Sequence, residues 1–196
     1  MNYLAHAFLS FNDTQLLIGQ FISDDVKGKK YELYPERIKQ GILLHRFVDH
    51  FTDTFPECLR IRAALREELG LFSPIAIDVF FDHLLSIHWK RYSLIPIETF
   101  ISDVYTTLTQ HQEHMTDGRR FFLRKMIEYD WLVQYKSLDG IALTFDQMSK
   151  RIAGGRKLSI ATALFEKHWK ISEEAFEIFF PKLISASKSK LDTFAP

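Results

Sequence analysis

The chain has 196 residues, and 46% of them are hydrophobic. This length favours one domain with a full hydrophobic core over two small domains. The 25 basic and 25 acidic residues give a formal net charge of zero, which argues against a general electrostatic grip on nucleic acid. We therefore expect a single domain over residues 1–196 that has no nucleic acid partner.

Signals for membrane insertion, secretion and disulfide bonding are lacking in the sequence. No run approaches the ~20 apolar residues that a spanning helix needs. The opening "MNYLAHAFLSFND" lacks the basic region and cleavage site of a signal peptide. Cys58 is the single cysteine, which excludes an intramolecular disulfide and a cysteine-based zinc site. We expect a soluble, cytoplasmic protein without a membrane partner; its oligomeric state is not predicted.

Helical periodicity extends through most of the chain. Pro35, Pro74 and Pro96 stand where helices are expected to begin, because the N–H that proline lacks would be unpaired there anyway. The pattern predicts one helix at the N-terminus, a second after Asn12-Asp13, further helices near 35–54, 57–69, 74–92, 96–110, 118–136 and 141–152, and one or two from residue 158 onward.

The fold class that follows is all-α. No alternating strand pattern is present, and Gly70 and the pair Gly154-Gly155 are expected to end helices. The last residues, "SASKSKLDTFAP", are expected to form a fraying tail. We predict a single-domain bundle of seven to nine helices.

Ionisable residues stand in several segments where a helix would normally present its core. His6 lies in "NYLAHAF", and Asp24 and Asp25 close the apolar run "LLIGQFISDDVKG". The segments "GILLHRFVDHFTD" and "IAIDVFFDHLL" add His45, Asp49, Asp53, Asp78, Asp82 and His83. An unpaired carboxylate is costly among apolar neighbours, so these positions need an explanation.

Two helices each offer a pair of metal-competent side chains at a four-residue spacing. His45 and Asp49 differ by about 40° around their helix, and Asp78 and Asp82 by the same angle. His83 is rotated about 100° from Asp82 and reaches the same centre only from the flank. A divalent cation shared by the two helices would balance the carboxylates, and a mixed His/Asp set suits Mn²⁺, Fe²⁺ or another first-row ion.

Ordinary structural roles also explain some of these residues. His6 taken alone is typical of a core histidine, and Asp25 and His50 are typical of solvent-exposed positions. Asp53 is placed to cap the end of its helix with Thr52 or to bond Arg60 or Arg62, and His88 is placed to bond its own backbone. A salt-bridge network with Arg46 and Lys90 is the alternative to a cation for the set of four, His45, Asp49, Asp78 and Asp82.

Motifs for other kinds of catalysis are missing. "HRFVDHFTD" is not the HExxH zinc signature, and the chain has no phosphate-binding glycine loop and no nucleophile elbow. If the protein is an enzyme, metal-activated water is the chemistry that remains.

Four motifs in order, "MNYLAH", "GQFISDDVKG", "GILLHRFVDHFTD" and "IAIDVFFDHLLSIHW", resemble the bacterial acyl carrier protein phosphodiesterase family. "DWLVQY" and the late "FFPKL" are also similar to it. The resemblance implies an all-α, HD-domain-like phosphohydrolase that depends on a divalent metal, with Mn²⁺ the metal that the family suggests. Such enzymes cleave the phosphodiester between 4′-phosphopantetheine and a serine of holo-acyl carrier protein, an acidic partner.

The motif positions that this resemblance aligns are His6, Asp24, His45, Arg46, Asp49, Asp53, Asp78, Asp82, His83 and His88. Asp25 stands where the family often has an apolar residue. From helix geometry we expect His45, Asp49 and Asp82 to hold the cation, with Asp24 or Asp78 completing the set and His6 as a further candidate ligand.

Three residues are expected to act on the reaction itself. Asp24 would accept or steer the proton of the attacking water. Arg46 and His83 would stabilise charge on the phosphoryl oxygens and the departing serine oxygen. The basic run "GRRFFLRK" is typical of a solvated helix face, and its residues Arg119, Arg120 and Arg124 are first candidates for docking the acidic carrier protein.

Two other functions fit the same sequence. One is a related HD-type phosphohydrolase that acts on a nucleotide or another small phosphoester. The other is a non-catalytic helical binding module in which the His and Asp side chains form an internal polar network. The sequence alone leaves both open.

Overall fold

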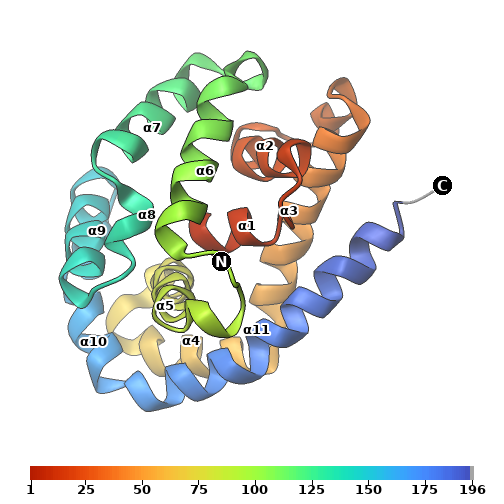
Figure 1. Cartoon of the computed structure of the whole chain (residues 1–196). Helices are drawn as coiled ribbons and strands as arrows, with labels where there is room; N and C mark the ends of the chain where they lie inside the picture. Colours follow the sequence, from red (N-terminus) through yellow and green to blue (C-terminus); the bar gives the residue numbers. More distant parts are fainter. Residues whose placement is uncertain (195–196) are drawn as a thin grey trace.

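Helices follow one another along the described chain, residues 1–194, of the computed structural model, and no strand occurs in that range (Figure 1). They are α1 (Tyr3–Phe8), α2 (Thr14–Ile22), α3 (Glu36–Thr54), α4 (Pro56–Leu69), α5 (Ser73–Ile87), α6 (Ile97–Gln110), α7 (Asp117–Glu128), α8 (Trp131–Gln134), α9 (Leu138–Arg151), α10 (Ala161–Lys167) and α11 (Trp169–Asp192). The predicted all-α class is confirmed, whereas the likeness to an HD domain stays a prediction.

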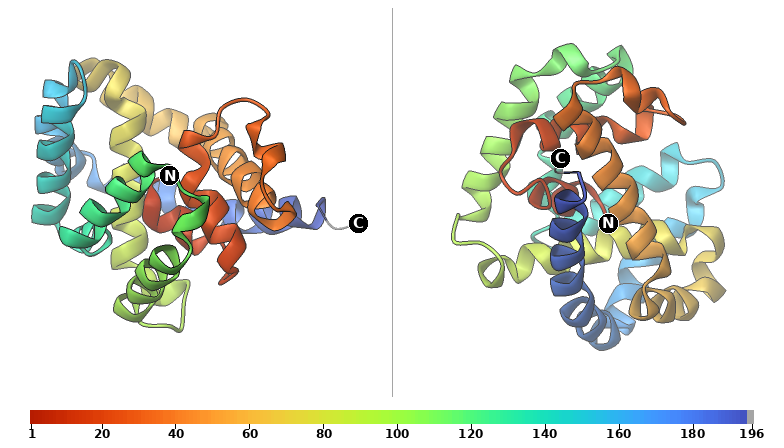
Figure 2. Two further views of the ribbon diagram at one scale, coloured as in Figure 1. Left: turned by 90° about the horizontal axis from the view of Figure 1, so that it is seen from above. Right: turned by 90° about the vertical axis from the view of Figure 1, so that its right-hand side faces the viewer.

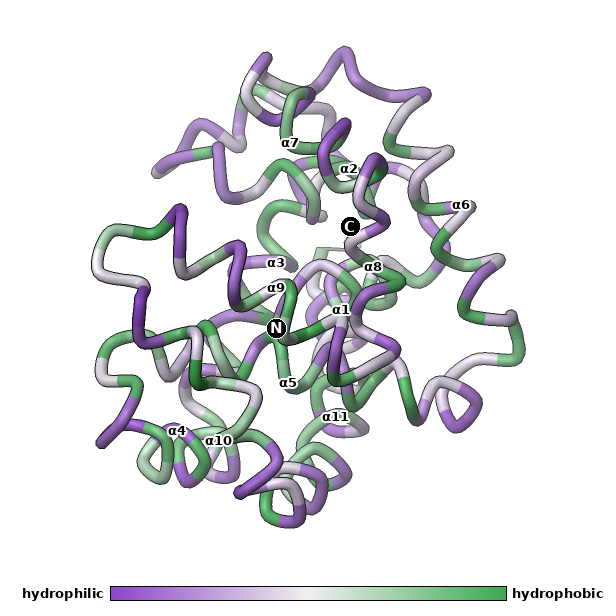
Figure 3. The backbone as a smooth tube through the Cα atoms, turned by 90° about the vertical axis from the view of Figure 1, so that its left-hand side faces the viewer, coloured by the Kyte–Doolittle hydropathy of each residue, from purple (hydrophilic) through white to green (hydrophobic). Residues whose placement is uncertain are grey.

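Helix α5 lies in the core because its sequence is apolar on nearly every side. Phe80 stacks on Phe165 of α10 with ring centroids 4.2 Å apart, and Phe81 contacts Phe176 of α11 edge-on. Figure 3 shows α5 mainly in the hydrophobic colour, whereas α4 and α11 alternate between hydrophobic and hydrophilic residues. Helix α1 packs against α5 and α2, with the N-terminus among the surrounding helices (Figure 1).

Helices α2 and α3 cross backbone to backbone, and two glycines make this possible. A Cβ atom added to Gly19 would lie 2.1 Å from the carbonyl oxygen of Ile38, and one added to Gly41 would lie 2.5 Å from that of Leu16. No side chain fits at either position. The crossing places His45, one turn after Gly41, beside the end of α2.

The segment 118–136, predicted as one helix, is two helices. Helix α7 ends at Glu128, and Asp130 takes a left-handed backbone conformation with φ of 47° before α8 begins. Aspartate tolerates this conformation better than most residues do, because its short side chain bonds locally. The chain turns there, and Leu132 is buried in the core.

The prediction of a fraying tail from residue 185 was wrong. Helix α11 continues to Asp192, and Leu191 packs against the core. The left view of Figure 2 shows its last turns extending past the neighbouring helices. Residues 195 and 196, which the same prediction included, lie outside the described range.

One stretch of the described chain, Pro56–Ile87, has the length and apolar composition of a membrane span. It contains α4 and α5, and Gly70 between them has a positive φ of 57°. Because 61% of its most apolar window is buried inside the fold, the stretch has the character of core helices.

Candidate metal centre and its pocket

Three segments of the first half of the chain meet at one cluster of imidazole and carboxylate groups. Helix α1 contributes His6, and α3 contributes His45 and Asp49 one turn apart. Asp24 comes from a 3-10 turn, Ser23–Asp25, that continues α2. Both histidines are buried, whereas the Asp49 side chain is 46% exposed and opens the cluster to the pocket.

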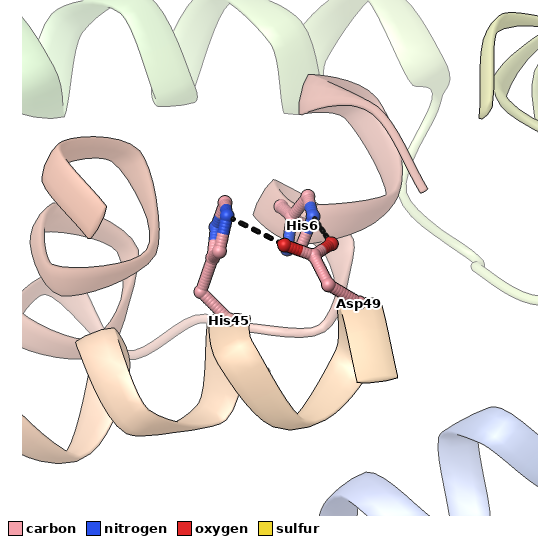
Figure 4. Close-up of side chains that lie close together, drawn as sticks. All are labelled: His6, His45 and Asp49. Atoms are coloured by element: carbon pink, nitrogen blue, oxygen red, sulfur yellow. Dashed lines mark hydrogen bonds and ion pairs between the residues drawn. The ribbon is translucent and has the colours of Figure 1, made fainter. Parts of the chain in front are cut away.

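The cluster is centred on the carboxylate of Asp49 (Figure 4). The Nε2 atom of His6 lies 3.1 Å from one oxygen of Asp49, and Nε2 of His45 lies 3.1 Å from the other. One ligand atom from each residue lies within 4.8 Å of the others, a spacing at which one ion can contact all three. Asp24 lies beside them, 3.4 Å from Nε2 of His45.

The hydrogen bond on the far side of His6 bears on whether a cation fits here. Nδ1 of His6 lies 2.8 Å from the side-chain oxygen of Gln20, so Nδ1 carries the proton that this bond needs. Burial, with the charge of His45, lowers the pKa of His6, and the neutral ring then presents an unprotonated Nε2 toward Asp49. Two electron-pair donors facing each other fit a shared cation, and a bond at the other ring nitrogen is usual for a metal-binding histidine.

His45 faces two carboxylates, and its pKa reflects them. Burial alone would lower the pKa of His45, but the hydrogen bonds to Asp24 and Asp49 outweigh it and raise the pKa to about 9. Burial opposes ionisation of Asp24, yet His45 and Arg119 lower its pKa to about 2. Burial likewise opposes ionisation of Asp49, yet His45 and His6 hold its pKa below its usual range. The site thus attracts positive charge.

The cluster lies in a pocket of about 540 Å³. Its wall also contains Asp53, Asp78, Met148 and Ile152. An oxygen of Asp78 accepts a hydrogen bond of 2.8 Å from the amino group of Met1. Asp78 therefore faces the same pocket as the cluster, but its nearest charge is this ammonium group.

Asp82, expected to bind the cation with His45 and Asp49, lies elsewhere. It is fully buried and accepts hydrogen bonds from the backbone N–H groups of Asn2, Leu4 and Ala5 at 3.2, 2.8 and 3.4 Å. Its carboxylate therefore fixes the first turn of α1. The four-residue spacing placed Asp82 on the face of Asp78, but the start of α1 covers it.

His83 and Arg46 also differ from their expected positions at the reaction centre. Nδ1 of His83 donates to the carbonyl oxygen of Tyr135, and the buried ring packs edge-on against Phe165 and Trp169. Arg46 donates to the carbonyl oxygens of Val26 and Gly28. These contacts make His83 a core residue and Arg46 a support for the loop after Asp25, and neither lines the pocket.

Arg119, expected on a docking surface, is only 5% exposed. Its guanidinium donates to both oxygens of Asp25 and lies 3.5 Å from Asp24. Asp25 is exposed, as predicted, but its carboxylate is paired with Arg119, which was not predicted. No local pattern in the sequence indicates this pair, because its members are separated by 94 positions.

The structure also tests the ordinary structural roles that were predicted for other polar residues. His50 is exposed and Asp53 lies 3.5 Å from Arg62, as predicted. His88 was expected to bond its own backbone, but its Nε2 bonds Glu173 of α11. Gln20 and Tyr3, which support His6 and Asp24, were not predicted. The polar Gln20 inside the apolar run of α2 is a local signal for the first, whereas no local signal indicates the second.

Fold and site together define an all-α protein with an open pocket whose wall holds a His/Asp cluster suited to a divalent cation. Residues 1–183 match the model of the family described as acyl carrier protein phosphodiesterase. The chain belongs to this family, which confirms the resemblance of its motifs.

Curated relatives match the chain along almost its whole length, and each is named acyl carrier protein phosphodiesterase. The protein of Pectobacterium atrosepticum is 32% identical over 197 residues, and those of Yersinia pestis and Escherichia coli are 29% identical over 193 and 195 residues. Each comparison covers 97% of this chain and 99% of the relative. No solved structure matches the chain.

Proposed function

We propose that this protein hydrolyses the phosphodiester that joins 4′-phosphopantetheine to a serine of holo-acyl carrier protein, leaving the apo form. The observation that carries the proposal is the convergence of His6, His45 and Asp49 in the pocket wall of a chain that belongs to this family. The name that the relatives share supplies the partner, acyl carrier protein, and the reaction class.

His6, His45 and Asp49 would hold a divalent cation, with Asp24 beside them. Two imidazole nitrogens with carboxylate oxygens are donors that Mn²⁺ accepts, and Mn²⁺ is the ion we propose. When bound, such an ion polarises a phosphoryl oxygen and lowers the pKa of water toward neutrality. Asp82 is excluded from this set because its oxygens are occupied by the backbone of α1.

Asp24 is the residue we assign to the attacking water. Its pKa of about 2 keeps the carboxylate ionised, and about half of its side chain is exposed. It can therefore accept a hydrogen bond from water and orient the oxygen toward phosphorus. Tyr3 and Arg119 hold Asp24 from the other side, at 3.4 and 3.5 Å.

A folded carrier protein is too large to enter the pocket, so it would dock outside while its prosthetic group enters. Arg119 is buried and cannot serve that docking, which leaves Arg120 and Arg124 from the predicted surface. We propose the cytoplasm as the location, on the sequence features described above and the bacterial origin of the relatives.

The test is incubation of the purified protein with Mn²⁺ and holo-acyl carrier protein, followed by mass spectrometry of the carrier protein. We expect loss of the phosphopantetheine mass, abolished in His45→Ala and retained in His50→Ala, an exposed position of the same helix. An unchanged carrier mass, with turnover of small phosphodiesters, would favour the small-substrate phosphohydrolase. Absence of both activities would favour the binding module.

A further inference from the structure

A second cavity, of about 270 Å³, adjoins the metal pocket. The two share the wall residues Tyr3, Met148 and Ile152, so a molecule bound at the cluster can extend from one into the other. The second cavity is slightly smaller than typical ligand pockets of about 300–1,000 Å³, which suits a narrow chain better than a bulky ring system.

One face of α9 forms a wall of this cavity. Thr144, Gln147, Met148 and Arg151 follow the spacing of three and four residues that places side chains on the same side of a helix. The aromatic rings of Phe122 and Trp131 form another part of the wall and pack edge-on with centroids 5.0 Å apart. Arg151 lies over the Trp131 ring at 5.2 Å.

The chemistry of the second cavity differs from that of the first. Its wall contains no Asp, Glu or His, so it offers nothing to hold a cation or to transfer a proton at neutral pH. It does combine apolar surface with the amide of Gln147 and the guanidinium of Arg151, whereas the hydroxyl of Thr144 donates to the carbonyl oxygen of Gly140. Such a wall suits a flexible chain that carries both methyl and amide groups.

We propose that the second cavity binds the pantetheine arm of the substrate while the phosphodiester lies at the cluster of His6, His45 and Asp49. The proposal rests on the proposed function. Pantetheine has two amide groups, a geminal dimethyl group and a terminal thiol, and it extends from the phosphate on the side away from the carrier protein. A bare acyl chain would leave the amide of Gln147 and the guanidinium of Arg151 facing hydrocarbon, which is unfavourable.

Pantetheine without its phosphate is the probe for this cavity, and Trp131 is the reporter. Titration of the wild-type protein with D-pantetheine should change tryptophan fluorescence in a saturable manner, and Trp131→Phe should lose the change. Thr144→Phe should weaken binding at least tenfold by filling the cavity. Leu143→Phe, at the exposed neighbouring position of α9, should bind like the wild type.

Several results would overturn the proposal: no saturable change, a change that persists in Trp131→Phe, equal binding by Thr144→Phe and Leu143→Phe, or saturable binding of octanoate in place of pantetheine. Circular dichroism checks that Thr144→Phe is folded. If it is not, the comparison of the wild type with Trp131→Phe still tests whether pantetheine binds beside Trp131. Failure to hydrolyse holo-acyl carrier protein would reject the proposed function without removing pantetheine binding, because the titration requires no turnover.

Discussion

The rings of His6 and His45 stack face to face, with centroids 3.9 Å apart and 13° between their planes. Each directs Nε2 toward a different oxygen of Asp49. Two stacked imidazoles resist simultaneous protonation, and the pKa of His6 is lowered by burial and by His45 while that of His45 is raised. Without a cation, His6 is therefore the neutral ring and His45 carries the proton, which a bound cation would have to displace.

The first prediction concerns metal binding by this set. Mn²⁺ at about 100 times its dissociation constant should stabilise the protein by about 2.7 kcal/mol. For a chain of this size that raises the melting temperature by roughly 5–10 °C. His45→Ala should lose the increase, whereas Asp82→Asn should keep it because Asp82 lies outside the set. Thermal scans with and without Mn²⁺ measure both; a full increase in His45→Ala would remove that residue from the site.

The second prediction is that ionisation of Asp82 makes the stability of the protein depend on pH. Burial raises the pKa of Asp82 to about 7, although the amino group of Met1 and the backbone N–H of Leu4 oppose the shift. The folded protein therefore binds a proton between pH 4 and pH 7 that the unfolded chain releases. The free energy of unfolding should fall as the pH rises through this window, by on the order of a few kcal/mol.

Urea unfolding at pH 5 and pH 7.5 tests this assignment. Asp82→Asn should cost about 1–3 kcal/mol at acidic pH, because its amide group meets backbone N–H donors. The variant should also lose the Asp82 share of the pH dependence. Asp146→Asn, at an exposed pair with Lys150, is the control that should retain it. Identical pH profiles for Asp82→Asn and the wild type would contradict the assignment.

The third prediction concerns the buried guanidinium of Arg119. Breaking a buried ion pair from one side typically costs about 3–5 kcal/mol, and since Asp25 is partly exposed we expect about 3 kcal/mol for Arg119→Ala. Arg119→Lys should recover only part of this, because lysine cannot bond both Asp25 oxygens as a planar fork. Arg124→Ala, at an exposed position of the same helix, should change stability by less than about 0.5 kcal/mol. Chemical denaturation gives all three values, and a neutral Arg119→Ala would refute the structural role.

The fourth prediction tests the crossing of α2 and α3. Gly41→Ala should destabilise the protein by more than about 3 kcal/mol, because a backbone atom at 2.5 Å cannot move aside as a side chain would. The displaced α3 would also shift His45 and Asp49, so bound Mn²⁺ should be lost with stability. Gly118→Ala meets nothing closer than 3.8 Å and should be neutral or stabilising by up to about 1 kcal/mol. A Gly41→Ala protein that is soluble and melts at the wild-type temperature would contradict so close a contact between the backbones of α2 and α3.

Local patterns in the sequence were sufficient for the fold class and for part of the site. Helix periodicity and the position of proline gave α3, α6 and the start of α5 to within a residue or two. The pair His45 and Asp49 follows from spacing on a single helix, where 100° per residue fixes the angle between side chains. Family membership was likewise visible in four ordered motifs.

Packing between distant segments decided the rest. The same spacing that pairs Asp78 with Asp82 cannot reveal that α1 covers Asp82 and supplies its N–H partners from 77 to 80 positions away. Nor can it reveal that His6, a core histidine by its neighbours, meets Asp49 across 43 positions. A helix fixes which residues share a face; whether that face meets a pocket, a backbone or a charge depends on contacts between helices, which only the tertiary structure determines.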